Sequence, residues 1–165
     1  MILREGDLEF CFSDAINAFK FDENDNTGKY YHGLSHCMKA VDFIVELEKY
    51  YLFVEVKDMY SPDEYNKPDK FNHLSNVLKE KFRDTFLYRY SENKLDKPVH
   101  YLCLINLENA LVTTLMKRLK IILPEGLNSK RWERPLAKSC IVANIERWNS
   151  RFPKWEVKRI QNNKN

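Results

Sequence analysis

Two short apolar segments that lie close together constrain the fold more than any other part of the sequence. Residues 39–47 and 51–57 are rich in Val, Ile, Phe and Leu, and only three residues, Glu48 to Tyr50, separate them. Two such runs joined by a short connection are typical of a β-hairpin. One face of this hairpin is wholly apolar and is expected to lie in the core; it carries Val41, Phe43, Val45, Leu47, Leu52, Val54 and Val56.

Three charged residues share the opposite face of the predicted hairpin. A two-residue turn at Glu48 and Lys49 would place Asp42 directly opposite Glu55. Lys57 points to the same face because side chains alternate along a strand. A four-residue loop would place Asp42 opposite Lys57 instead, and only a three-residue loop would separate the three charges.

Two interpretations of these charges are open from the residues alone. They could form a cross-strand ion pair on a solvent-exposed face, worth ~0.5 kcal/mol. Alternatively, Asp42 and Glu55 could bind Mg²⁺, which prefers carboxylate oxygens together with water and substrate phosphate, while Lys57 helps to deprotonate the attacking water. Ile44 and Phe53 are predicted on the same face, which indicates that this face is covered and favours the functional interpretation.

Periodicity along the rest of the chain predicts helices and strands of a mixed α/β domain. Helices are expected over residues 8–19, 70–90 and 111–122, and from Pro135 to before Pro153. Residues 99–107 are almost continuously apolar, which predicts a strand buried on both faces, and residues 155–160 predict a last short strand. The expected fold class is therefore a central mixed sheet with helices on both sides.

Asp42, followed after twelve intervening residues by Glu55-Val56-Lys57, resembles the D…ExK signature of the PD-(D/E)XK nuclease superfamily, which has the restriction-endonuclease-like fold. The predicted order of helix, hairpin, helix and buried strand over about residues 5–108 is similar to the α-β-β-β-α-β core of that superfamily. The first core strand is not evident unless residues 29–32 form it, and Val41 replaces the Pro of the signature. Residues 109–165 are expected to form a C-terminal helical extension of this single domain.

The resemblance implies a metal-dependent endonuclease that hydrolyses phosphodiester bonds, with DNA as the expected substrate and RNA left open. Asp42 and Glu55 would bind Mg²⁺ or Mn²⁺ together with the carbonyl of Val56, and Lys57 would position or activate the attacking water. Similar small members act in restriction, defence or recombination. The alternative function is a non-catalytic nucleic-acid-binding or protein-interaction module of the same fold.

The resemblance also suggests site residues outside the hairpin. Glu9, in the expected first helix, would add an acidic group to the metal shell. On the helix that follows the hairpin, Lys81 is the better candidate for a polar residue aimed at the site, and Arg83 is the weaker one.

Charge is divided unevenly along the chain. Residues 1–69 contain 7 Lys and Arg against 15 Asp and Glu, whereas residues 70–165 contain 20 against 9. Such a division suits cation binding in one part and polyanion binding in another, and an uneven solvated surface is the alternative.

A basic cluster around one Trp predicts contact with nucleic acid and comprises Lys117, Arg118, Lys120, Lys130, Arg131, Trp132 and Arg134. The alternative there is a solvated helix end with Trp132 packed inward.

Composition adds expectations about location and partners. No apolar run approaches the ~20 residues that cross a bilayer, and the first residues are acidic and polar, so we expect a cytoplasmic protein without a membrane partner. The four cysteines show no CxxC spacing and are expected to be free thiols. A homodimer or a partner subunit could supply the specificity for which one small domain has little room.

Overall fold

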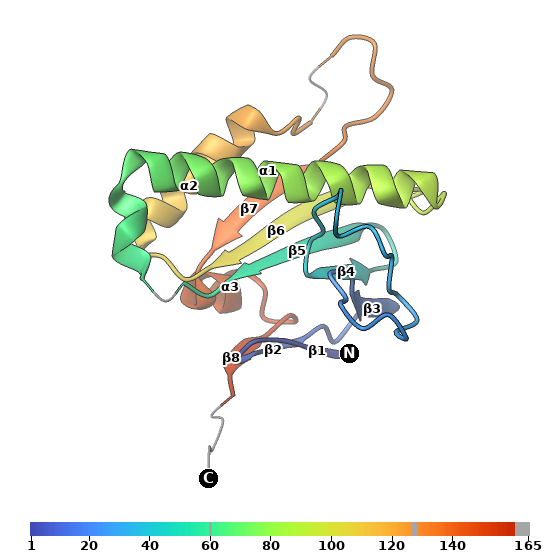
Figure 1. Cartoon of the computed structure of the whole chain (residues 1–165), viewed down its shortest axis with the longest axis horizontal. Helices are drawn as coiled ribbons and strands as arrows, with labels where there is room; N and C mark the ends of the chain where they lie inside the picture. Colours follow the sequence, from blue (N-terminus) through green and yellow to red (C-terminus); the bar gives the residue numbers. More distant parts are fainter. Residues whose placement is uncertain (60, 127–128, 161–165) are drawn as a thin grey trace.

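The computed structural model describes residues 1–59, 61–126 and 129–160, and its centre is a five-stranded sheet (Figure 1). The strands, in spatial order, are β3 (Asn17–Lys20), β4 (Phe43–Glu46), β5 (Tyr51–Lys57), β6 (Val99–Ile105) and β7 (Ser139–Ala143). Neighbouring strands run antiparallel from β3 to β5 and parallel from β5 to β7, so the sheet is mixed.

Two long helices cover one face of this sheet. After the short 3₁₀ helix η1 (Pro62–Asn66), α1 (Pro68–Ser91) connects β5 to β6, and α2 (Asn109–Ile122) connects β6 to β7. Because both right-handed crossovers step in the same direction across the sheet, they place both helices on one face (Figure 1). Leu78 of α1 and Leu115 of α2 pack into one core with Phe53 and Tyr101 of the sheet. No helix in the described ranges is both long and apolar enough to span a membrane.

A smaller antiparallel sheet and a short helix cover the opposite face. Its strands are β1 (Ile2–Glu5), β2 (Leu8–Cys11) and β8 (Val157–Arg159), in the order β1-β2-β8, and α3 (Ile145–Arg151) follows β7. The rings of Phe10 and Trp148 pack edge to face, with centroids 5.8 Å apart, in a core that includes Val54. The expected fold class, a mixed sheet covered on both sides, is confirmed.

The hairpin, the long helix and the buried strand are confirmed. Ile44 lies opposite Phe53 in the register of the two-residue turn, and both side chains are fully buried under α1. Val41 differs from the expectation, because it packs in the core beneath α1 instead of sharing the face of Phe43. It precedes β4, so the strand alternation does not extend to it, and its backbone N–H donates to Thr85 Oγ1.

The predicted first helix over residues 8–19 is wrong. Leu8, Phe10 and Phe12 are all fully buried, a period of two that suits a strand, and this segment forms β2 and then β3. Gly6, with φ of 55°, makes the tight turn between β1 and β2 that lets the first residues pair with β2. β3 is the strand beside β4, whereas residues 29–32 form no strand.

The predicted helix from Pro135 to Pro153 is also wrong over most of its length. Residues 139–143 pair with β6 as an edge strand, and only Ile145–Arg151 is helical. Asn144 begins this helix, because its side chain accepts a hydrogen bond from the backbone N–H of Arg147 at 3.0 Å. The predicted last strand is confirmed as β8, so the C-terminal extension combines strands and helices instead of being helical.

Candidate active site

Asp42 and Glu55 meet at the end of the hairpin that lies away from its turn. Asp42 immediately precedes β4, and Glu55 is in β5. The backbone N–H of Val56 donates to Asp42 Oδ2 at 2.6 Å, which fixes the Asp42 carboxylate beside β5. Asp42 is 6% exposed and Glu55 is fully buried, so the predicted alternative of a solvent-exposed ion pair is wrong for Glu55.

Two lysines from different elements contact the same oxygen of Glu55. The Nζ atoms of Lys57, in β5, and Lys81, in the middle of α1, each lie 2.9 Å from Glu55 Oε1. Lys81 Nζ also lies 3.9 Å from Asp42 Oδ1 and 3.6 Å from Asp22 Oδ2. The long helix therefore carries an ammonium group to the carboxylate pair, as predicted for Lys81.

Burial dominates the electrostatics of this cluster. It raises the pKa of Glu55 to about 8, and the charge of Asp42 adds to the shift while the two lysines oppose it. Burial likewise raises the pKa of Asp42, against the opposing charge of Lys81 and the hydrogen bond from Val56. Burial acts to lower the pKa of Lys81, but the carboxylates of Glu55 and Asp42 outweigh it and raise this pKa. A divalent cation at this position would therefore compete with a proton.

The Glu55 carboxylate is poorly compensated by hydrogen bonds. Both of its oxygens are buried without a hydrogen-bond partner among the described residues, and the two lysine ion pairs are at Oε1, so Oε2 in particular lacks the compensation that a buried carboxylate oxygen needs. Together with Asp42 and the neighbouring Val56 carbonyl, it provides the hard oxygen donors that Mg²⁺ and Mn²⁺ prefer, so the residues fit such an ion. Residues 1–59, 61–126 and 129–160 contain no group of three His, Cys, Asp or Glu side chains that could hold a metal. Water and substrate phosphate would therefore have to complete the coordination shell.

Glu9 and Arg83 form ion pairs with residues outside the carboxylate pair. Glu9 lies in β2 and not in a helix, because that segment is a strand; its Oε2 accepts from Arg4 Nη2 at 2.7 Å, and its Oε1 lies 3.2 Å from Lys158 Nζ. These partners come from the neighbouring strands β1 and β8. Arg83 forms an ion pair with the adjacent Asp84 at 2.9 Å.

Asp22 and Thr85 also contribute to the site, although their contacts were not predicted from the sequence. Asp22 follows β3 and is held near the site because the Phe21 N–H donates to the Asp42 carbonyl at 2.8 Å. Thr85 is fully buried and accepts the N–H of Val41 at 3.0 Å, which anchors to α1 the segment that leads into Asp42. A signal was present for Thr85, because it lies four residues after Lys81 on the buried side of a predicted helix.

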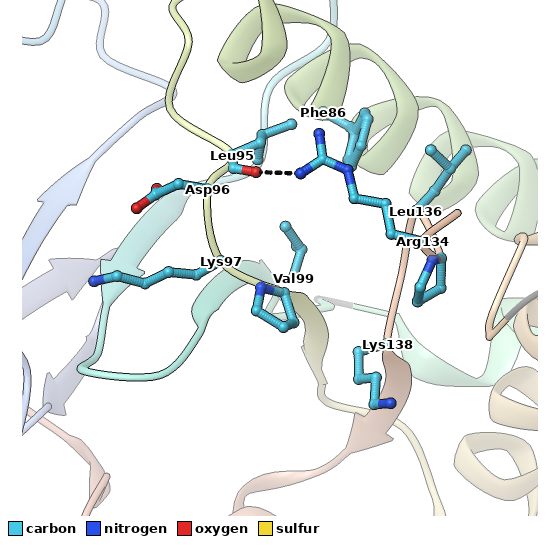
Figure 2. A pocket seen from close by; sticks show the side chains of 10 residues that line it. Phe86, Leu95, Asp96, Lys97, Val99, Arg134, Leu136 and Lys138 are labelled. Carbon is cyan, nitrogen blue, oxygen red and sulfur yellow. Dashed lines mark hydrogen bonds between the residues drawn. The ribbon is translucent and has the colours of Figure 1, made fainter. Parts of the chain in front are cut away.

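The basic cluster lies on α2 and the segment before β7. Its seven residues have exposed positions, and Trp132 is 38% exposed, so the Trp is not packed inward as the alternative held. Lys120 pairs with Glu125 at 3.2 Å. Arg134 donates to the Leu95 carbonyl at 2.7 Å, across one side of an apolar pocket of about 240 Å³ (Figure 2). This pocket adjoins the start of β6, whereas Glu55 lies in the second half of β5, so the structure does not bring Arg134 to the carboxylate pair.

Comparison with known proteins adds little to this geometry. Neither a protein-family model nor a curated protein matches the chain. Among solved structures, the chain is similar to the small subunit of the heterodimeric restriction endonuclease R.BspD6I, with 10% identity and a TM-score of 0.40. The match covers 81% of this chain and 55% of that chain, so this protein spans about half the length of that subunit. A match this weak carries no argument about function.

Proposed function

We propose that this chain is a metal-dependent nuclease of the PD-(D/E)XK type that hydrolyses phosphodiester bonds in DNA. The observation that carries the proposal is the fully buried Glu55 carboxylate, whose Oε1 lies in ion-pair contact with two lysines and neither of whose oxygens has a hydrogen-bond partner among the described residues. A structural ion pair requires only one cation and gains little from burial, because desolvation offsets the attraction. A site that must bind a cation and a phosphate next to each other explains both the uncompensated buried carboxylate and the two lysines beside it.

Each residue of the cluster has a distinct part in the proposed reaction. Asp42, Glu55 and the Val56 carbonyl would hold Mg²⁺ or Mn²⁺, which when bound lowers the pKa of water and offsets phosphate charge. The hydrogen bond from Val56 holds Asp42 in place before the ion arrives. Lys57, with 31% of its side chain exposed, is accessible to a substrate and would orient the attacking water and stabilise the added negative charge on phosphorus. Lys81 is buried and would keep Glu55 oriented.

Cleavage assays with matched lysine variants test this proposal. Linear, supercoiled, branched and single-stranded DNA, together with RNA, are incubated with Mg²⁺ or Mn²⁺ and with a chelator. We expect metal-dependent cutting by the wild type, at least a 100-fold loss in Lys57→Ala, and no loss in Lys49→Ala. Lys49 is a suitable control because it is an exposed lysine in the turn of the same hairpin.

Two results would contradict the proposed nuclease. Equal cutting by Lys57→Ala and the wild type would place the activity elsewhere or in a contaminant. Absence of cutting on every substrate, combined with metal-independent binding of nucleic acid, would favour the non-catalytic module. Metal binding is measured separately by thermal unfolding: Mg²⁺ should raise the melting temperature of the wild type and leave that of Asp42→Asn unchanged.

The basic cluster is proposed as the surface that binds the nucleic-acid backbone. Lys117, Arg118, Lys130 and Arg131 lie at exposed positions, and the partly exposed Trp132 ring could stack on a base. Replacing Arg131 by Ala should weaken binding and reduce the salt dependence of the affinity. An unchanged salt dependence would exclude Arg131 from the interface.

Size-exclusion chromatography with and without DNA would show whether a homodimer forms, and a partner subunit remains a proposal.

A further inference from the structure

A small pocket opens beside Lys57, between the end of β5 and the first turns of α1. Its volume is about 140 Å³, and it is lined by Lys57, Met59, Tyr65, His73, Leu74 and Val77. Because Lys57 Nζ lies 2.9 Å from Glu55 Oε1, one wall of the pocket belongs to the proposed catalytic cluster. A group that enters the pocket therefore lies beside Lys57, the residue proposed to act on the scissile phosphate.

The lining of this pocket combines apolar walls with nitrogen-containing side chains. Met59, Leu74 and Val77 are apolar, and Tyr65 of η1 contributes an aromatic ring. Lys57 and the exposed His73 of α1 provide hydrogen-bond donors at the same pocket. A flat aromatic group attached to a phosphate matches this chemistry, because bases stack on aromatic rings and ammonium groups bind phosphate.

The size of the pocket allows a single base to enter but not a base pair. A paired base is hydrogen-bonded to its partner and stacked on both sides, so it cannot enter a pocket of this volume without leaving the duplex. We propose, resting on the nuclease function above, that this pocket binds an unpaired base next to the scissile phosphate. His73 donates a hydrogen bond to the flanking phosphate. The preferred substrate is then single-stranded or locally unpaired nucleic acid.

A pocket-filling variant and a neighbouring control test this subsite. Val77→Phe places a ring in the pocket, whereas Asn76→Phe adds the same ring at an exposed position of α1. The probe is a single-stranded DNA oligonucleotide carrying the fluorescent base 2-aminopurine, with a chelator present to prevent cleavage. We expect the wild type and Asn76→Phe to quench the fluorescence on binding, and Val77→Phe to bind roughly tenfold more weakly. The same probe in a complete duplex should show little quenching.

The subsite and the nuclease can fail independently. If Val77→Phe binds and quenches the probe as the wild type does, or if the duplex responds as strongly as the single strand, the subsite is overturned whatever the cleavage assays show. If the wild type cuts nothing in Mg²⁺, the nuclease fails while the binding assay still decides the subsite. Tyr65→Leu provides a second variant should Val77→Phe not fold; it removes the stacking ring and should also bind the probe about tenfold more weakly.

Discussion

Replacement of Glu55 by Gln is expected to remove a pH-dependent cost from the folded protein. Burial raises the pKa of Glu55 from 4.5 to about 8. Between these two values the folded state holds a proton that the unfolded state has lost, so the stability of the wild type falls as the pH rises. At about 1.4 kcal/mol per pH unit, the loss from this group between pH 5 and pH 8 is roughly 3 kcal/mol. Gln has a similar shape and does not ionise, so the variant should lack this loss.

Urea unfolding at pH 5, 6, 7 and 8 measures the effect. The experiment is done with a chelator, and unfolding is followed by the fluorescence of the fully buried Trp148. The free-energy difference between Glu55→Gln and the wild type should grow by about 3 kcal/mol in favour of the variant from pH 5 to pH 8. Groups that do not interact with Glu55 cancel, including His100, whose pKa burial lowers. Glu48→Gln, at an exposed position of the same hairpin, should show no such growth.

A difference that stays constant with pH would refute this reasoning. It would mean that Lys57 and Lys81 keep Glu55 ionised in the folded protein and that their charges, not burial, dominate. Addition of Mg²⁺ at pH 8 gives an independent check. It should stabilise the wild type, in which the ion compensates the buried charge, and should leave Glu55→Gln unchanged.

Three further substitutions test the packing around the site by urea unfolding. Thr85→Val leaves the buried N–H of Val41 without an acceptor and should cost about 1–3 kcal/mol, whereas Thr114→Val at an exposed position of α2 should change stability by less than about 0.5 kcal/mol. Equal effects of the two would remove Thr85 as an anchor. Leu78→Ala, in the fully buried stripe of α1, should cost about 2–5 kcal/mol, and a smaller loss would show that α1 packs loosely over the sheet. Arg159→Ala removes an exposed ion pair to Asp58 and should cost less than about 1 kcal/mol, decreasing further in 1 M salt; a salt-independent loss would contradict an electrostatic origin.

The candidate site shows which residue positions can be predicted from local sequence patterns and which cannot. Asp42, Glu55 and Lys57 were predicted to share a face because strand side chains alternate with a fixed period, and the register of β4 and β5 follows the two-residue turn. Lys81 was suggested by the resemblance to the nuclease superfamily, on the helix that follows the hairpin, and the structure places its Nζ 2.9 Å from Glu55 Oε1. Helical spacing indicated the buried side of α1 for Thr85, but the contacts of Asp22 with Lys81 and of Thr85 with Val41 could not be predicted in this way, because these partners are 59 and 44 residues distant along the chain.

The hairpin, the long helix, the buried strand and the shared face of Glu55 and Lys57 could be predicted from the sequence alone, since each depends on periodicity within a short segment. Tertiary structure decided the state of residues 8–19 and 139–143. Their apolar positions are compatible with either helix or strand, and strand pairing with β8, β4 and β6 is what stabilises them as strands. Burial of Glu55 was likewise a tertiary outcome, because it requires α1 to lie across β5 and bring Lys81 to the carboxylate. Charge and alternation are local properties of a chain, whereas the solvent exposure that sets a carboxylate's pKa depends on the elements packed over it.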